Sequence, residues 1–145
     1  MSTTSLLYEK DFYAWTQEQI KLIENKLFNK IDYQHLSEEL QIMGRSEKRE
    51  LSHRLTVLLM HLLKWKHQPL RQCKSWIVTI YEQRQELEDV LSDNPSLKHN
   101  FDEHFSKAYS RAVSKASVET GLDAKFFAPQ CEWTIEQILD PDFLP

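Results

Sequence analysis

The feature that most constrains this chain is a helical apolar repeat that returns in almost every segment. In the most apolar segment, leucines stand at positions 51, 55, 58, 59, 62 and 63, the three- and four-residue spacing of one helix face. We expect this helix to be central and to contact several neighbours. Only Gly44 and Gly121 are glycines, whereas β-rich domains and phosphate-binding loops normally need more. The 145 residues are enough for one core. The sequence therefore predicts one all-α domain, a helical bundle over residues 1–145.

Capping signals divide this repeat into five helices and a short sixth. We expect the helices over residues 11–27, 33–43, 47–67, 75–93 and 95–120, and a short last one after residue 134. Asp32 is expected to cap the second helix, and Thr134 with Gln137 form a capping-box pattern for the last. Pro69 should end the third helix, and Gly121 the fifth.

Further expectations concern Gly44 and the two ends of the sequence. Gly44 followed by Ser46 predicts a break between the second and third helices, either a hairpin turn or a kink. Residues 1–8 are expected to be a flexible N-terminus. Residues 122–145 are expected to be an irregular tail whose short helix packs on the bundle.

Cysteine content and hydropathy suggest a compartment. Cys73 and Cys131 are too few for a disulfide framework, so we expect reduced thiols in a cytoplasmic protein. The first residues show no basic region followed by an apolar run, so no secretory signal is expected. The longest apolar stretch, residues 55–65, is far shorter than the roughly 20 residues that span a bilayer, so no membrane partner is expected.

Several polar residues lie on or beside the apolar faces. Arg84 falls within the seam of the fourth helix, and Glu39 and Glu119 border the seams of theirs. His61 interrupts the apolar run VLLMHLLKW at the edge of its arc. Because burying an unpaired charge costs several kcal/mol, we expect Arg84 to pair with Glu39 or Glu119, and His61 to join them.

This set has three readings. It is a buried network that fixes helix register, a hydrolase-like pocket, or a group of side chains that reach water. In the pocket reading, Glu39 is a general base, His61 an acid or base, and Arg84 an anion clamp. A metal site is not expected, because Glu50-x-x-His53 has no second copy and its nearest echo, Asp32-x-x-His35, begins at a cap. No cofactor is expected.

The charge is unevenly distributed. Residues 45–84 hold nine Lys or Arg and three Asp or Glu, whereas the whole chain has a net charge of −4. This segment predicts a phosphate-contacting surface, interrupted by Glu47 and Glu50, or else a solvated or acid-paired face. Its expected members are Arg45, Lys48, Arg49, Lys64, Lys66, Arg71 and Lys74.

Six stretches together resemble the family catalogued as domain of unknown function number 29. They are DFYAWTQEQ, LSEELQIMGRSEKREL, HLLKWKHQP, SWIVTIYEQR, DNPSL and ILDPDFLP, and their order covers residues 8–145. The resemblance implies a compact all-α domain in a soluble, bacterial setting, since members are common in cyanobacteria. The family carries no established activity, so the resemblance implies no catalytic residue.

Since no enzyme pattern survives this reading, we expect a cytoplasmic helical module that acts by binding another protein. Acidic outer helices and an aromatic C-terminal tail would supply that surface. Nucleic-acid binding through residues 45–74 is the first alternative, and the pocket at Glu39, His61 and Arg84 is the second. The sequence leaves the oligomeric state open.

Overall fold

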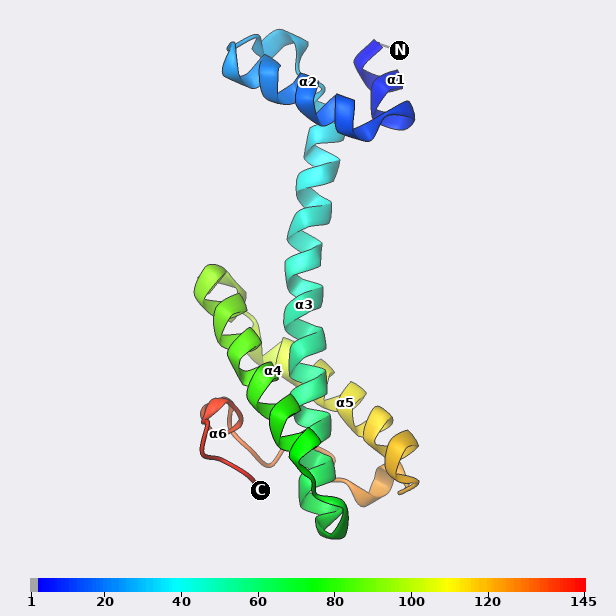
Figure 1. The fold of residues 1–145 in the computed structure, drawn as a ribbon, viewed down its shortest axis with the longest axis vertical. Helices are drawn as coiled ribbons and strands as arrows, with labels where there is room; N and C mark the ends of the chain where they lie inside the picture. Colours follow the sequence, from blue (N-terminus) through cyan, green and yellow to red (C-terminus); the bar gives the residue numbers. More distant parts are fainter. Residues whose placement is uncertain (1–2) are drawn as a thin grey trace. The chain divides into compact units, whose positions relative to one another are not determined.

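The computed structural model describes residues 3–145, with side chains from Leu6 onward, and every regular element in this range is helical. The α-helices are α1 (Thr3–Lys10), α2 (Phe12–Glu24), α3 (Tyr33–His67), α4 (Lys74–Asp93), α5 (Phe101–Thr120) and α6 (Ile135–Leu139) (Figure 1). Short 3-10 turns stand between them: η1 (Phe28–Lys30), η2 (Pro69–Arg71), η3 (Pro95–Lys98) and η4 (Ala124–Phe126). The prediction of an all-α fold is confirmed.

The chain divides into two compact units, Met1–Ser46 and Glu47–Pro145. In the N-terminal unit Trp15 is buried, and its indole Nε1 donates to Asp32 Oδ2 over 3.1 Å. The carboxylate of Asp32 also accepts from the backbone N–H of His35 over 3.4 Å, as expected for the N-cap of α3. That all residues form one domain stays a prediction.

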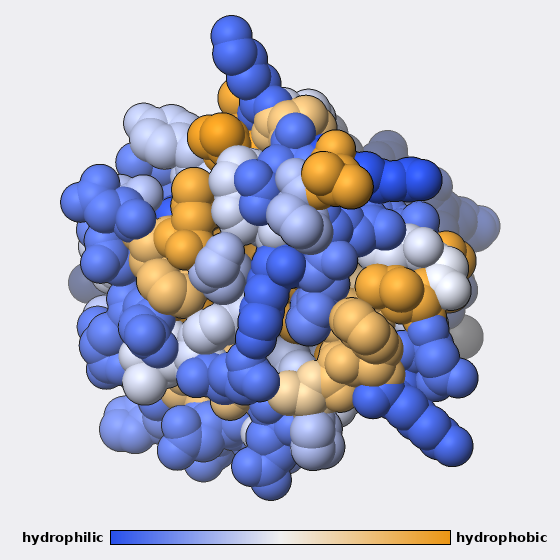
Figure 2. All heavy atoms as spheres, turned by 90° about the horizontal axis from the view of Figure 1, so that it is seen from below, coloured by the Kyte–Doolittle hydropathy of each residue, from blue (hydrophilic) through white to orange (hydrophobic). Residues whose placement is uncertain are grey.

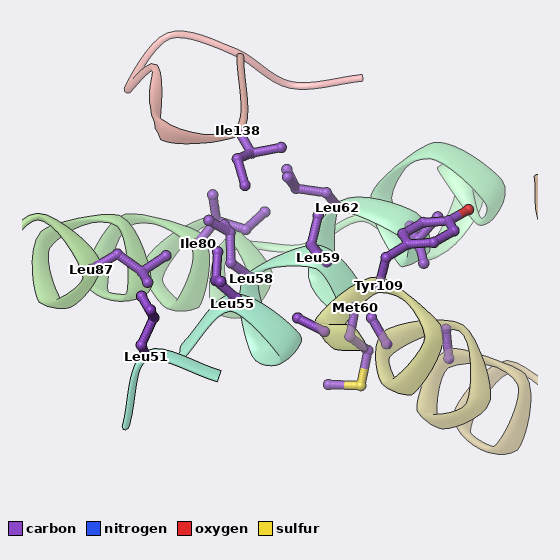
Figure 3. Close-up of a cluster of buried hydrophobic side chains, with 14 of the residues drawn as sticks. Leu51, Leu55, Leu58, Leu59, Met60, Leu62, Ile80, Leu87, Tyr109 and Ile138 are labelled. Atoms are coloured by element: carbon purple, nitrogen blue, oxygen red, sulfur yellow. The ribbon is translucent and has the colours of Figure 1, made fainter. Parts of the chain in front are cut away.

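The core of the C-terminal unit forms between α3 and its neighbours. In Figure 1, α4 and α5 flank the C-terminal half of α3. Figure 3 shows side chains from four helices pointing toward one another: Leu51, Leu55, Leu58, Leu59 and Leu62 from α3, Ile80 and Leu87 from α4, Tyr109 from α5 and Ile138 from α6. Burying one such side chain stabilises the fold by about 1.5–3 kcal/mol. The leucine repeat thus marks the central helix, as the sequence predicts.

Of the two alternatives predicted at Gly44, the hairpin turn is wrong. One helix, α3, runs without interruption from Tyr33 to His67, and Gly44 lies inside it. A glycine within a helix costs about 1 kcal/mol relative to alanine. A break would cost more, because two new helix ends would each leave up to about four backbone groups without helical partners. Helix continuation is therefore the cheaper outcome.

Two other boundaries differ from the expectations. Thr3–Lys10 is helical where a flexible N-terminus was expected, and residues 1–2 lie outside the described range. The fifth predicted helix is divided into η3 and α5 by Asn100, whose φ is +59°. Asparagine tolerates this left-handed conformation better than most residues, and the sequence pattern did not reveal it.

The C-terminal segment follows its predicted capping signals. Gly121 ends α5 with a φ of +77°, a conformation that glycine adopts without strain. Thr134 and Gln137 form the reciprocal capping box at the start of α6. Phe127 and Ile138 are buried in the core of the C-terminal unit, which holds this segment against the helices.

Candidate anion-binding groove

A groove of about 400 Å³ lies in the C-terminal unit, lined by one face of α3 and one face of α5. Its lining residues are Lys48, Arg49, Ser52, His53, Thr56, His104, Lys107, Arg111 and Lys115. Five of these are Lys or Arg, two are His, and no carboxylate is among the lining residues of this part of the described chain. The groove is therefore a concentrated site of positive charge in a chain whose net charge is −4.

Helical spacing brings these cations together. On α5, Lys107, Arg111 and Lys115 recur every four residues, so they lie along one face. On α3, Lys48, Ser52 and Thr56 have the same spacing. Each helix thus contributes a row of polar side chains, and the two rows meet in the groove.

A hydrogen bond ties the two rows together. Arg111 Nη1 donates to Ser52 Oγ over 3.1 Å. The hydroxyl of the buried Thr56 donates to the carbonyl oxygen of Ser52 over 2.7 Å. Both bonds fix polar groups of α3 where the cations of α5 approach.

Most of these cations lack an ion-pair partner in the described chain. Lys107 Nζ lies 3.2 Å from Glu103, and both side chains are about two-thirds exposed, at 65% and 64%. Such a pair contributes little, because water and salt screen it. Among residues 3–145, the structure records no ion pair for Lys48, Arg49, Arg111 or Lys115.

The two glutamates that interrupt the basic sequence have partners elsewhere. Glu47 accepts a hydrogen bond from Asn94 Nδ2 over 3.2 Å. Glu50 lies 3.7 Å from Arg54, which also approaches Glu86 of α4 at 3.8 Å. Neither Glu47 nor Glu50 lines the groove. These two glutamates therefore do not directly neutralise the charge of the groove.

A comparison with family models identifies the family of this chain. The model of the domain of unknown function DUF29 matches residues 7–144. The chain belongs to the DUF29 family. No curated protein and no solved structure matches it. Membership in DUF29 agrees with the resemblance noted in the sequence and adds no activity that could be assigned to the groove.

One face of this DUF29 member shows how hydropathy is distributed over its surface. On the face seen in Figure 2, hydrophilic side chains cover most of the surface, and apolar ones form several separate groups among them. Within residues 3–145, no helix combines the length and the apolar character needed to cross a bilayer.

The groove includes only part of the basic surface predicted from sequence. Lys48 and Arg49 line it. Arg71 and Lys74 are exposed beside the turn between α3 and α4 and do not line it. Arg45 belongs to the N-terminal unit.

Lys64 and Lys66 are engaged with other side chains of the C-terminal unit. Lys64 Nζ lies 2.7 Å from Glu119 and 4.6 Å from the ring centroid of Trp76. Lys66 pairs with Glu132 and lies 6.0 Å from the ring of Trp133. The acid-paired alternative therefore describes these two lysines.

His53, His104, Lys107, Arg111 and Lys115 were not predicted to belong to a basic surface. The predicted surface was confined to the basic stretch at residues 45–84 and included no residue of α5. The signal was present, because three cations recur at four-residue intervals between residues 107 and 115. Which faces of α3 and α5 adjoin each other was not readable from either helix alone.

The expected network among Glu39, His61, Arg84 and Glu119 is not formed, because these side chains have other hydrogen-bond partners. Arg84 donates to three backbone carbonyls: Nε to Ile138 (2.7 Å), Nη1 to Pro141 (3.3 Å) and Nη2 to Phe143 (2.6 Å). Glu119 pairs with Lys64 instead. The buried guanidinium is therefore hydrogen-bonded to backbone carbonyls of the C-terminal segment. A pattern of side chains in the sequence cannot reveal partners of this type.

His61 and Glu39 also have local partners. His61 Nδ1 lies 2.9 Å from the carbonyl oxygen of Val57, one turn earlier in α3. Burial lowers the pKa of His61, against the opposing effect of this hydrogen bond. In the N-terminal unit, Tyr8 donates to Glu39, and this bond, aided by burial, raises the pKa of Tyr8 to about 12. A catalytic role for Glu39, His61 and Arg84 stays a prediction.

A second polar cluster in the N-terminal unit supports its fold. His35 Nδ1 lies 2.7 Å from Asp32 Oδ2, and the ring of Tyr8 stacks on His35 with centroids 4.0 Å apart. Burial alone would raise the pKa of Asp32, but hydrogen bonds from His35 and Trp15 lower it. Within residues 3–145, no three His, Cys, Asp or Glu side chains are arranged to hold a metal ion.

Proposed function

We propose that the chain is a nucleic-acid-binding module that holds a sugar–phosphate backbone in the groove between α3 and α5. The observation that supports this most is the convergence of five Lys or Arg and two His side chains with no carboxylate among them. Phosphate groups would release bound counterions as they meet these cations, which drives most non-specific nucleic-acid binding. This develops the nucleic-acid alternative of the sequence, with a different set of residues.

The arrangement favours a polyanion over a single small anion. Lys107 and Lys115 are eight residues apart, so the cations of α5 extend over about 12 Å of helix. A charge row of this length suits a ligand whose charges repeat. The described lining residues include no Phe, Tyr or Trp, so the large aromatic platforms for base stacking are not among them. We therefore expect contacts to the backbone and weak dependence on base sequence.

The test is fluorescence anisotropy with a labelled random-sequence DNA duplex of about 20 base pairs, titrated at several salt concentrations. Binding should weaken steeply with salt. The variant Lys107→Glu/Lys115→Glu should bind at least about tenfold more weakly, since two phosphate contacts become repulsive. Both side chains are exposed, so the fold should persist, as circular dichroism would verify.

A matched control separates groove charge from total charge. Lys21→Glu/Lys125→Glu makes the same change in net charge at two exposed positions outside the groove. It should bind like the parent chain. Absence of binding at low salt, or equal losses in the two double variants, would reject the proposal.

Protein binding is the second candidate, and exposed apolar side chains in the N-terminal unit favour it. Phe12, Leu40 and Met43 are exposed by 48%, 60% and 63%. Exposed apolar groups of this kind mark interaction surfaces when they are contiguous. A pull-down with nuclease treatment would distinguish this candidate, because only a protein partner survives the nuclease. A cytoplasmic location stays part of the proposal.

A further inference from the structure

Arg84 of α4 is a buried cation without a recorded ion-pair partner in the described chain. Its side chain is 7% exposed, and the structure shows no Asp or Glu within ion-pair distance of it. Three carbonyl oxygens accept its hydrogen bonds, at Ile138, Pro141 and Phe143. Carbonyl dipoles stabilise the guanidinium but do not neutralise it. The charge of Asp140 counteracts the effect of burial on the pKa of Arg84, but no ion-pair contact between the two is recorded.

Arg84 is one of the residues that line a hollow. It has a volume of about 390 Å³ and is lined by Arg84, Glu88, Leu91, Ser92, Lys98, Leu139 and Pro141. This volume lies within the range of about 300–1,000 Å³ that small-molecule sites occupy. The hollow is formed by α4, η3 and the C-terminal segment, and no residue of the α3–α5 groove lines it.

The lining specifies the chemistry of a ligand. Arg84 and Lys98 are cationic, while Leu91, Leu139 and Pro141 are apolar. A guanidinium has five N–H donors, so two remain after the three carbonyl bonds. Two guanidinium N–H groups suit the two oxygens of a carboxylate, which would add a negative charge in direct contact with Arg84. The carboxylate of Glu88 in the same hollow disfavours a doubly charged ligand such as phosphate.

We propose that this hollow is a binding site for a small monocarboxylate with an aliphatic body. Its carboxylate meets Arg84 and Lys98, and its aliphatic chain packs on Leu91, Leu139 and Pro141. The site does not depend on the nucleic-acid groove, and neither proposal stands or falls with the other. A ligand of this size in an open hollow should bind with a dissociation constant of about 0.1–1 mM.

The experiment follows the Nε–H signal of Arg84 by NMR while octanoate is added to the full chain. This group is suited to the purpose because its hydrogen bond to the Ile138 carbonyl is buried. A saturable shift with octanoate is expected. Acetate should produce a shift only at concentrations at least about tenfold higher, since it lacks the aliphatic chain. Octylammonium should produce none, because its charge is reversed.

Two variants control for binding elsewhere without removing Arg84. Ser92→Trp at an exposed position of α4 should fill the hollow and abolish the octanoate shift. Lys98→Glu should weaken octanoate binding at least about fivefold by repulsion. No saturable shift of the parent signal at about 10 mM octanoate, tenfold above the upper limit of the expected dissociation constant, would overturn the proposal. A shift that persists unchanged in folded Ser92→Trp would overturn it too.

Discussion

Arg111 and Ser52 are joined across the candidate groove by a hydrogen bond of 3.1 Å between Nη1 and Oγ. This exposed contact orients a cation of α5 toward α3 before any ligand arrives. A cation held in place loses less side-chain entropy on binding than a freely rotating lysine. The groove thus combines one positioned charge, Arg111, with exposed lysines such as Lys115 that adapt to a ligand.

Neutralising one groove lysine should change the salt dependence of nucleic-acid binding. If Lys115 contacts a phosphate, Lys115→Gln should make the slope of log affinity against log salt shallower by about one unit. The measurement is a series of anisotropy titrations at different salt concentrations. Lys125→Gln, at an exposed position outside the groove, should leave the slope unchanged. Identical slopes for parent and Lys115→Gln would show that this side chain contacts no phosphate.

Ser52→Ala tests whether positioning of Arg111 matters. The charge of the groove is unchanged, so the salt slope should stay the same. Affinity should fall by about two- to fivefold, because the guanidinium must then be ordered during binding. A change in the slope itself would indicate that Ser52 acts on the number of contacts instead.

Arg84 should be a strong determinant of stability. Arg84→Met removes three hydrogen bonds and leaves carbonyls of the C-terminal segment without their donor. The expected loss in the free energy of unfolding is about 2–4 kcal/mol, measured by urea denaturation. Arg84→Lys keeps the charge but lacks the fork of donors, so it should also destabilise. Proteolysis after residue 134 should become faster in both variants.

The control for the Arg84 variants is a substitution of its acidic neighbour, Asp140. Asp140 opposes the effect of burial on the pKa of Arg84, yet the two side chains form no recorded ion pair within the described residues. Asp140→Asn should therefore cost under about 1 kcal/mol. A larger loss than for Arg84→Met would mean that charge, and not the carbonyl bonds, secures the segment.

Acidification should destabilise the C-terminal unit through two histidines. Burial lowers the pKa of His61, and burial followed by the charge of Lys66 lowers that of His67. Below about pH 6.5 the unfolded chain therefore takes up protons that the folded chain does not. The stability from these neutral imidazoles is fully present above that pH and decreases as the pH falls toward the folded-state pKa.

The measurement compares urea midpoints at about pH 7.5 and pH 5.5. His61→Gln/His67→Gln should lose less stability over this interval than the parent chain. His99→Gln, at an exposed position, serves as the control. An equal pH dependence in the parent and the double variant would exclude His61 and His67 as its source.

Much of this fold could be predicted from the sequence, because helices that pack against one another carry apolar residues at regular helical spacing. The repeat from Leu51 to Leu62 predicted the central helix, and the capping residues Thr134 and Gln137 predicted the last one. These signals are local, so one stretch of sequence contains them entirely. The helix boundary at Asn100 was not predicted, because the left-handed backbone conformation is only one of several that asparagine adopts.

The candidate groove was only partly predictable for a different reason. Lys48 and Arg49 stood in a recognised basic segment, but Lys107 and Lys115 came from a helix more than fifty residues later. Which helix faces adjoin is a tertiary property. The partners of Arg84 were equally hidden, because backbone carbonyls carry no residue-specific signal. Side-chain pattern can show that a buried charge needs a partner but not which main-chain atoms will supply it.

The two glycines should respond to alanine in opposite directions. Gly44 lies within α3, and an added Cβ would meet no atom within 4 Å. Gly44→Ala should therefore stabilise the helix by about 0.5–1 kcal/mol, because alanine has the higher helix propensity. Gly121 has equal space, but its φ of +77° strains any residue with a Cβ. Gly121→Ala should cost about 1–2 kcal/mol. Thermal unfolding followed by circular dichroism measures both. If Gly44→Ala instead lowered the melting temperature of the chain, α3 would be broken at Gly44 in solution and the two-helix reading of the sequence would be restored.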